Sequence, residues 1–555
     1  MSRHRHRRPA PRKKAREQVA LRALIAGGLV AALGVGVGLW ASDGDDSAPT
    51  GAVAGRQSAQ GSVSGERSAV AAPSASPGPS RTYPLSTAPR TIPAVRTHTA
   101  ARGPGWRPAA GHRVVVGDPR LADEGRLIAG ELGMAYAGQK SDNRAGDLRL
   151  TLGGSGNPES YTMTVRGGRV TVTGPSDAGV FYGTRTLKQE VRKGGTAPEG
   201  VVKDAPAKPQ RAFQLDIARK YFSPGWIEDR IRELGDLKYN EFGLHFSDDQ
   251  AFRIASDTHP EIVAAQHLTK AQVKSIVDLA ASRHITVVPE IDSPGHLGAV
   301  LAAHPELQLR NVNGVATRGA IDISEDASGK LLDDLLNEYA GLFPGGQWHL
   351  GGDEYQALTV ANPAASFPQL ATAAQQRYGS GAGVADLATG WLNDRADTVR
   401  AHDRTMRVWN DGFFRNASVK PASDLVVAYW TGKEIGARVP VDYLSAGRKV
   451  LNYNDEYLYY VLGEPQTFVY PTGQRIYQQW TPRVLRGTTA VSSRYDAQIL
   501  GGAFSVWCDL ANSQTQAQVA AGIRMPLRAT AQKLWDARTP ALTWTQFRTL
   551  AGRLG

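Results

Sequence analysis

From about residue 206 onward, short apolar segments alternate with longer stretches of helical periodicity, and this alternation limits the fold more than any other feature of the sequence. Strands that alternate with helices form parallel sheets. Eight segments have strand character: 213–217, 241–246, 285–291, 347–352, 405–410, 424–430, 449–454 and 502–507. The pattern predicts an α/β fold, a (β/α)8 TIM barrel over residues 206–555, although a long connection from Tyr457 to Leu500 interrupts the alternation.

Polar or aromatic residues stand at or just beyond the carboxyl ends of most of these strands. A barrel of this kind gathers its functional residues at that end. We therefore expect the following side chains to surround one site: Arg219, Asp248, Asp292, Asp353, Asp411, Trp430, Asp455 and Asp509.

The first 105 residues contain three segments of different composition. Residues 1–22 carry nine Lys or Arg against Glu17 alone, and residues 23–40 form an uncharged, mostly apolar run near the lower length limit for spanning a bilayer. Positive charge before such a run places the N-terminus in the cytoplasm. We expect a basic cytoplasmic segment and an uncleaved membrane anchor; a cleaved signal peptide is the main alternative, and a buried soluble helix is disfavoured by its glycines. Residues 41–105, rich in Ser, Ala, Pro and Gly, predict a disordered linker.

Charge and cysteine content exclude two classes of protein. The net charge is +12, but the first 22 residues account for +8, so the remaining chain is nearly balanced and is not a basic nucleic-acid platform. Cys508 is the only cysteine, which excludes an intrachain disulfide framework and a cysteine zinc cluster.

Residues 106–205 predict a small α+β domain before the barrel. They contain an apolar run at 114–116, a helical stretch at 121–132, alternating strands near 148–152, 161–165 and 170–172, and an amphipathic helix that begins near Ser176.

The sharpest local motif is Trp348-His-Leu-Gly-Gly-Asp-Glu354, an apolar strand that leads through two glycines into paired carboxylates. Neighbouring residues on a strand point to opposite sides, so Asp353 and Glu354 are not expected to act together as acid and nucleophile on one bond. A second carboxylate nearby should raise the pKa of Glu354, which suits a general acid.

Three more motifs surround this pair: 215–222 (LDIARKYF), 245–253 (HFSDDQAFR) and 288–296 (VPEIDSPGH). Together, the four motifs resemble those of glycoside hydrolase family 20, the β-N-acetylhexosaminidases, and the resemblance covers about residues 106–545. It implies substrate-assisted catalysis, in which the 2-acetamido carbonyl of the sugar attacks the anomeric carbon to give an oxazolinium intermediate. Glu354 would protonate the leaving oxygen and Asp353 would hold the acetamido N–H.

The resemblance implies roles for further residues and requires no cofactor or metal. Asp248 and His296 would support the acid pair. Substrate-binding roles are implied for Arg219, Tyr457, Trp391, Trp409, Trp507 and Asp509, with Trp430 as a weaker candidate for the aromatic wall.

The sequence departs from the commonest family pattern at two places. Tyr457-Leu-Tyr459 stands where Tyr-x-Asp is frequent, and Trp507-Cys-Asp509 stands where Trp-x-Glu is frequent. Similar details occur in lacto-N-biosidases, which release a disaccharide.

The expected function is therefore an exo-acting β-N-acetylhexosaminidase acting on oligosaccharides or glycoconjugates. Lacto-N-biosidase activity and non-catalytic carbohydrate binding are the alternatives. The N-terminal segment predicts a position on the extracellular face of the membrane, or secretion if the segment is cleaved.

Overall fold

The computed structural model describes residues 82–433 and 437–555, which belong to one compact unit. The predicted basic segment 1–22, the predicted anchor 23–40 and most of the predicted linker lie outside these residues and stay predictions. Among the described helices, none combines the length and apolarity that crossing a membrane requires.

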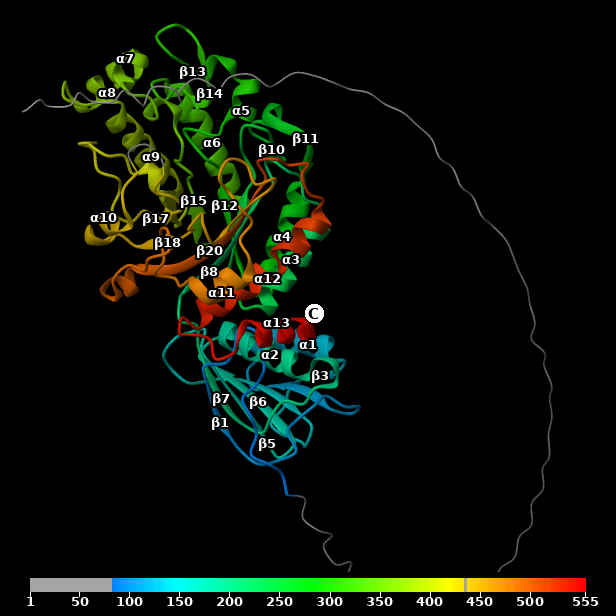
Figure 1. The fold of residues 1–555 in the computed structure, drawn as a ribbon. Helices are drawn as coiled ribbons and strands as arrows, with labels where there is room; N and C mark the ends of the chain where they lie inside the picture. Colours follow the sequence, from blue (N-terminus) through cyan, green and yellow to red (C-terminus); the bar gives the residue numbers. More distant parts are fainter. Residues whose placement is uncertain (1–81, 434–436) are drawn as a thin grey trace, which may run out of the picture. The chain divides into compact units, whose positions relative to one another are not determined.

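All eight predicted barrel strands are present and run parallel. They are β8 (Gln210–Asp216), β9 (Glu241–His245), β12 (Thr286–Glu290), β15 (Gln347–His349), β16 (Thr405–Trp409), β17 (Val426–Tyr429), β18 (Val450–Asn452) and β20 (Ile499–Trp507). They are hydrogen-bonded in the order β20-β8-β9-β12-β15-β16-β17-β18, and β18 pairs in turn with β20. This last pairing closes the sheet into the predicted barrel (Figure 1).

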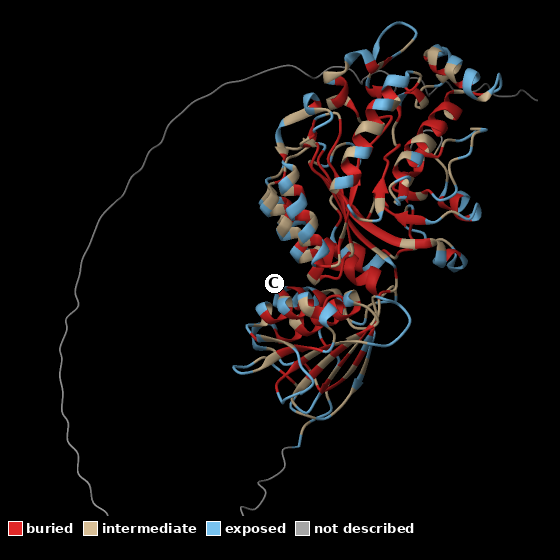
Figure 2. Cartoon of the chain, turned by 180° about the vertical axis from the view of Figure 1, so that it is seen from behind, coloured by how far each residue is buried: buried red, intermediate tan, exposed pale blue. Residues whose placement is uncertain are grey.

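Helices pack around the barrel, whose strands are coloured mostly as buried in Figure 2. Buried apolar residues of the strands and helices form one continuous core. The helices of residues 206–555 are α3 (Pro224–Asp236), α4 (Lys270–Ala281), α5 (Gly298–Ala303), α6 (Asp326–Leu342), α7 (Pro363–Ser366), α8 (Pro368–Tyr378), α9 (Val384–Arg400), α10 (Pro440–Ser445), α11 (Gly473–Gln479), α12 (Gln516–Trp535) and α13 (Trp544–Leu554). In the fully described connection between β16 and β17, one 3-10 turn, Asn410–Gly412, replaces a helix.

The long connection before β20 contains a short extra strand, β19 (Tyr459–Val461), which the sequence pattern did not predict. The first half of β20 pairs with β18, and its second half pairs with β19, in a register that sets Val461 opposite Trp507. An irregularity near Gly501 accompanies this change of partner. Gly501 has a φ of +152°, and a Cβ there would lie 1.7 Å from the Gln210 carbonyl oxygen, so only glycine fits.

The preceding domain is a seven-stranded sheet in the order β1-β7-β5-β6-β4-β2-β3, with two helices on one face. Its elements are β1 (Thr97–Ala100), β2 (Arg113–Val116), α1 (Ala122–Leu132), β3 (Ala135–Gln139), β4 (Leu148–Leu152), β5 (Tyr161–Arg166), β6 (Arg169–Gly174), α2 (Asp177–Val191) and β7 (Gly200–Asp204). The Ser176 side chain accepts a hydrogen bond from the Gly179 N–H and caps α2, close to the predicted helix start. The predicted α+β domain is confirmed.

The predicted end of the linker at residue 105 is wrong. Strand β1 pairs antiparallel with β7, and Ile92 is fully buried against the barrel core. The Gln189 side chain exchanges two hydrogen bonds, each 2.8 Å, with the Ile92 backbone. Strand β1, Thr97-His-Thr-Ala100, is held at the edge of the sheet by backbone hydrogen bonds. Because it contains no large apolar residue, its composition did not indicate a strand.

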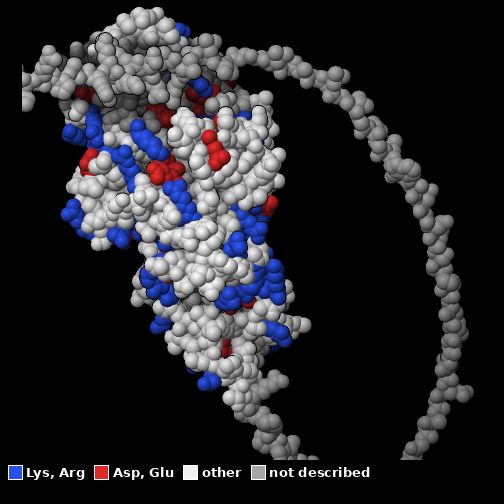
Figure 3. Space-filling model, viewed as in Figure 1, with Lys and Arg blue, Asp and Glu red and all other residues white. Residues whose placement is uncertain are grey.

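Charged side chains are spread over the surface of both domains. On the face in Figure 3, Lys and Arg side chains occur on the barrel and on the small domain, with acidic side chains among them over the barrel. This distribution agrees with the small charge excess of the chain beyond residue 22.

A buried polar cluster joins the small domain to the barrel. Asp204, at the end of β7, accepts hydrogen bonds from Tyr161 Oη at 2.7 Å and from Trp535 Nε1, on α12, at 3.0 Å. Lys238 Nζ lies 3.5 Å from the same carboxylate and 4.3 Å from the Trp535 ring. Lys238 is fully buried, and burial lowers its pKa to about 8. Asp204 is thus the anion that offsets a buried ammonium group.

We expect Asp204→Ala to lower the free energy of unfolding by about 3–5 kcal/mol, because the substitution leaves Lys238 buried without its counter-ion. Asp278→Ala, which breaks an exposed pair with Lys274, is the control and should cost at most about 1 kcal/mol. Chemical denaturation of both variants measures the difference. Equal, small effects would show that the cluster does not join the two domains energetically.

Candidate active site

The loop after β15 places the two predicted carboxylates at the carboxyl end of the barrel. Gly351 and Gly352 have φ values of +68° and +98°. A Cβ at Gly351 would lie 1.8 Å from Asp292 Oδ1, and the Gly352 N–H donates a 2.7 Å hydrogen bond to that same oxygen. The two glycines therefore let the backbone close onto Asp292, and this approach fixes the position from which Asp353 and Glu354 emerge.

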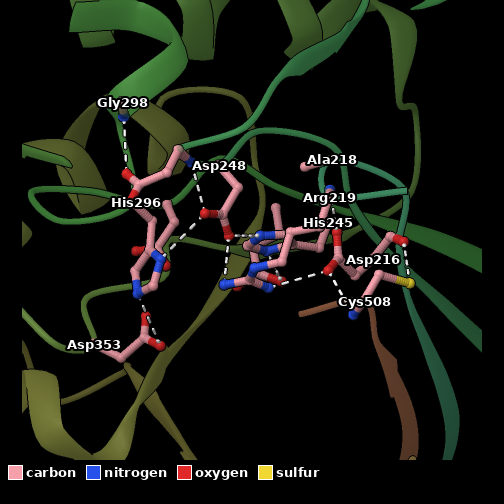
Figure 4. Close-up of polar contacts among 12 residues, drawn as sticks. Asp216, Ala218, Arg219, His245, Asp248, His296, Gly298, Asp353 and Cys508 are labelled. Atoms are coloured by element: carbon pink, nitrogen blue, oxygen red, sulfur yellow. Dashed lines mark hydrogen bonds and ion pairs between the residues drawn. The ribbon is translucent and has the colours of Figure 1, made fainter. Parts of the chain in front are cut away.

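His296 brings both predicted acids together. Its Nε2 lies 3.7 Å from Asp353 Oδ2, and its Nδ1 lies 3.4 Å from Asp248 Oδ1 (Figure 4). The same Nε2 lies 3.4 Å from Glu354 Oε2. Glu354 and His296 are both non-glycine residues with positive φ, +48° and +55°. Such backbone strain persists where the surrounding structure holds it, often at functional sites.

His296 carries the positive charge among these four residues. Burial disfavours the imidazolium, but Asp248 and Asp353 outweigh this cost and raise the pKa of His296 well above its ordinary value. Burial works against the charge of Asp248 as well, yet His296 and Arg219 hold the pKa of Asp248 well below its usual range. The predicted supporting pair is thus an ion pair behind the two acids.

Asp353 and Asp292 form a second pair, in which two carboxyl groups of like charge lie close together instead of a carboxylate and an imidazolium. Burial raises the pKa of Asp292 to about 6. Burial, together with the proximity of Asp292, raises the pKa of Asp353 well above its usual range. Two carboxyl groups this close do not both ionise easily, so the pair retains a proton.

The prediction that a neighbouring carboxylate raises the pKa of Glu354 is wrong. The contact with His296 Nε2, at 3.4 Å, is the largest influence, and it lowers the pKa of Glu354 below its ordinary value. The Glu354 side chain is also 41% exposed, whereas the Asp353 side chain is 17% exposed. The raised pKa therefore belongs to the more buried acid, Asp353.

Arg219 continues the ionic chain on the other side of Asp248. Its guanidinium lies 2.8 Å from Asp248 Oδ2 and 3.0 Å from Asp216 Oδ2, and it stands 5.6 Å from the Trp507 ring centre. The Cys508 N–H donates to the same Asp216 oxygen at 3.0 Å (Figure 4). Arg219 is thus held in one orientation before any ligand binds.

A cavity of about 410 Å³ opens above these residues, within the size range of ligand sites. Its lining includes six predicted site residues, Arg219, His296, Asp353, Glu354, Trp507 and Asp509, and also Trp430 and Asp455. Burial is the main cause of a raised pKa for Asp509. Trp430, the weaker aromatic candidate, donates from Nε1 to Asp411 at 2.9 Å.

Three predicted aromatic contacts do not line the cavity. Trp391, on α9, is buried and donates from Nε1 to Ser293 Oγ at 3.1 Å, which makes it a support for the loop before His296. Trp409 lies beneath the site, 5.9 Å from the Trp507 ring, and donates to Glu290 at 2.9 Å. Tyr457 is buried under Arg475, with 4.2 Å between the ring centre and the guanidinium carbon.

Tyr459 lines the cavity in place of Tyr457, and the sequence reasoning missed it. Alternation along β19 points Tyr459 and Val461 to the same side, into the cavity. Tyr459 also stacks between Trp430, at 5.9 Å, and Phe468, at 6.4 Å. The only indication in the sequence was the short apolar run Tyr459-Tyr-Val461, which forms β19. A strand of three residues is too short to be recognised from its hydrophobic pattern.

The barrel, its adjacent carboxyl pair and its aromatic-walled cavity define a glycoside hydrolase of the barrel class. Residues 209–538 match the model of the "Glycosyl hydrolase family 20, catalytic domain", and residues 88–205 match that of "Glycosyl hydrolase family 20, domain 2". The chain belongs to glycosyl hydrolase family 20.

Several known proteins are similar to this chain. A lacto-N-biosidase from Bifidobacterium bifidum is 29% identical over 497 residues, which cover 88% of this chain and 43% of that protein. A β-hexosaminidase from Porphyromonas gingivalis is 34% identical over 226 residues, 35% of this chain and 29% of that protein. The matched part thus spans less than half the length of either relative. The solved structure of a family 20 β-N-acetylhexosaminidase from Streptomyces coelicolor is 25% identical, with a TM-score of 0.66, and the match covers 85% of this chain and 96% of that one.

We expect Asp292→Asn to stabilise the protein at pH 7.5 by about 1–3 kcal/mol and to have little effect near pH 4. The pKa of Asp292 is raised to about 6 in the folded protein, so between about pH 4 and 6 the folded state binds more protons than the unfolded state. Stability from this group therefore falls as the pH rises through that window. Asparagine keeps an oxygen for the Gly352 N–H and does not ionise.

Denaturation of wild type and variant across pH 4 to 8 tests this expectation. The exposed Asp278→Asn serves as the control and should give a pH-independent difference. A pH-independent difference for Asp292→Asn would contradict the proton-sharing pair.

Proposed function

We propose that the enzyme hydrolyses terminal β-N-acetylhexosaminides by substrate-assisted catalysis. The observation that carries this proposal is the state of Asp353. Asp353 lines the cavity, and its buried Oδ1 accepts no hydrogen bond from an N–H or O–H group among residues 82–433 and 437–555. A buried carboxylate oxygen in this position requires a donor. The N–H of a 2-acetamido group would supply one.

Glu354 is positioned for proton transfer to the leaving group. It faces the same cavity beside Asp353, but its carboxylate is the more exposed of the two. A bound sugar that excludes water from the cavity disfavours the charged form and raises the pKa of Glu354 toward that of a general acid. Glu354 would first protonate the glycosidic oxygen and then, as a carboxylate, activate the water that opens the intermediate.

The acetamido carbonyl would act as the nucleophile, and Asp353 would stabilise the positive charge that develops on the acetamido nitrogen. The neighbouring Asp292, with its pKa near 6, provides a place for the proton that the pair shares in the free enzyme. The Asp248–His296 ion pair would hold both acids in position.

The remaining polar residues of the cavity suit recognition of a sugar. Arg219 presents a fixed guanidinium beside Trp507, and Asp509 supplies an acceptor for hydroxyl groups. Trp507 and Tyr459 supply flat faces for the apolar side of a sugar ring. These residues bound one side of the cavity, as binding of a terminal sugar by an exo-acting enzyme requires.

We expect Glu354→Gln to reduce turnover of substrates with poor leaving groups by about 10²–10⁴-fold, because no proton reaches the leaving oxygen. Asp353→Asn should reduce turnover by about 10²–10³-fold through lost stabilisation of the acetamido nitrogen. Both variants should still bind a thiazoline inhibitor that mimics the oxazoline. Glu456→Gln, a carboxylate beside Arg475 outside the cavity lining, is the control. Full activity of the Asp353 variant would refute substrate assistance.

Release of a disaccharide is the second candidate function, and the wall around β19 favours it. The cavity extends from Asp353 and Trp507 past Val461 to Phe468 and Lys433. Val461 gives this wall no hydrogen-bond acceptor for a terminal hydroxyl group, and Phe468 adds an aromatic surface beyond Tyr459. The similarity to a lacto-N-biosidase over 88% of the chain supports the same candidate.

Chromogenic β-N-acetylglucosaminide and β-lacto-N-bioside substrates distinguish the two candidates. A hexosaminidase should cleave the monosaccharide substrate, with thiazoline inhibition. A lacto-N-biosidase should cleave the disaccharide alone, and Phe468→Ala should then raise the KM about tenfold through loss of stacking on the second sugar. Binding of both substrates without turnover would identify a non-catalytic sugar-binding protein and refute both activities.

A further inference from the structure

Two histidines and a glutamate converge on one point outside the catalytic cavity. His259 precedes the 3-10 turn η3 (Pro260–Ile262), which contains Glu261, and His304 follows α5. His259 Nδ1 and His304 Nε2 each lie 2.9 Å from the same atom, Glu261 Oε1. The three potential ligand atoms lie within 4.8 Å of one another, and none of the three residues lines the catalytic cavity.

The other nitrogen of each histidine faces a second carboxylate. His304 Nδ1 lies 3.3 Å from Glu306 Oε1, and His259 Nε2 lies 3.8 Å from Asp334 Oδ2, on α6. His259 Nε2 is buried and has no hydrogen-bond partner within the described part of the chain. A carboxylate behind each imidazole is the usual arrangement around a metal-binding histidine, because it fixes the ring and increases its basicity.

The segment before His259 is held rigidly. Glu338, on α6, accepts hydrogen bonds from Ser256 Oγ and the Asp257 N–H, each at 2.7 Å, and pairs with Lys270. The Ser256 hydroxyl oxygen in turn accepts from the His259 N–H at 3.0 Å. The histidine backbone is therefore set before any ligand arrives.

We propose that His259, Glu261 and His304 bind a divalent transition-metal ion of the zinc type. Two imidazoles and one carboxylate are a common zinc ligand set, and bonds of about 2.0–2.2 Å would fit between atoms already this close. The three side chains are 16%, 42% and 21% exposed, so an ion can enter and a water molecule can complete the coordination.

The ion would tie the turn after β10 (Phe252–Ile254) to the end of α5. The other end of α5 begins two residues after His296, the imidazole that contacts both catalytic acids. The metal would therefore fasten the far end of a segment whose near end belongs to the active site. This inference rests on the geometry of the cluster and does not depend on the proposed function.

The test is titration of the metal-stripped full chain with Zn²⁺ by calorimetry and with Co²⁺ by visible absorption. Wild type should bind one ion at this site and give the d–d bands of a four- or five-coordinate cobalt. His259→Ala and His304→Ala should each weaken binding by on the order of 100-fold, and Asp334→Asn by about tenfold. His402→Ala removes an exposed histidine that contacts Asn337, and it should bind like wild type.

Glu261→Gln is a second test in case the alanine variants misfold. Glutamine has nearly the same shape as glutamate and can still form hydrogen bonds, but it lacks the anionic oxygen that would bind the ion. This variant should also lose most of the affinity. Unchanged Zn²⁺ affinity in His259→Ala and Glu261→Gln would overturn the proposal. Loss of Zn²⁺ binding in Asp353→Asn would also overturn it, because the ion would then bind in the catalytic cavity. No binding by wild type would overturn it too.

Discussion

The positive charge on His296 is the interaction on which the active site depends. Asp248, Asp353 and Glu354 all approach this one imidazole, and without its charge the loop after β9, which carries Asp248, and the loop after β15, which carries the other two acids, would repel each other. Arg219 extends the same alternation of charge across Asp248 to Asp216. The site is therefore an ionic chain supported by the barrel strands, and its geometry exists before any sugar binds.

The two acids receive different properties from this chain because they differ in burial. Asp353 is the more buried acid and shares a proton with Asp292, whereas Glu354 is more exposed and contacts the imidazolium of His296. Neighbours in the sequence thus occupy different electrostatic environments. This difference is what a mechanism requires when one carboxylate aligns the substrate and the other transfers protons.

The sequence predicted features that rest on periodicity and local motifs. All eight barrel strands, the small domain and the positions of Arg219 and Asp353 follow from apolar patterns and strand ends. Glu354 follows from the motif at residues 348–354, and the resemblance to the family implied a role for His296. Properties that arise from packing were not predictable in this way. The low pKa of Glu354 depends on the direction of a histidine from another loop, and the exchange of Tyr457 for Tyr459 depends on how a three-residue strand pairs with β20. β1 escaped notice because backbone pairing leaves no trace in composition.

The close approach of Gly351 to Asp292 also limits how the enzyme can change over evolution. Every other residue at position 351 would place a Cβ within the Asp292 carboxyl group, so a mutational library at this position should return glycine alone. The wall formed by Val461, Phe468 and Lys433 carries no such restriction, because no glycine is among the residues that line the cavity. Variation in sugar preference can therefore accumulate along one wall of the cavity while the backbone that presents the acids stays fixed.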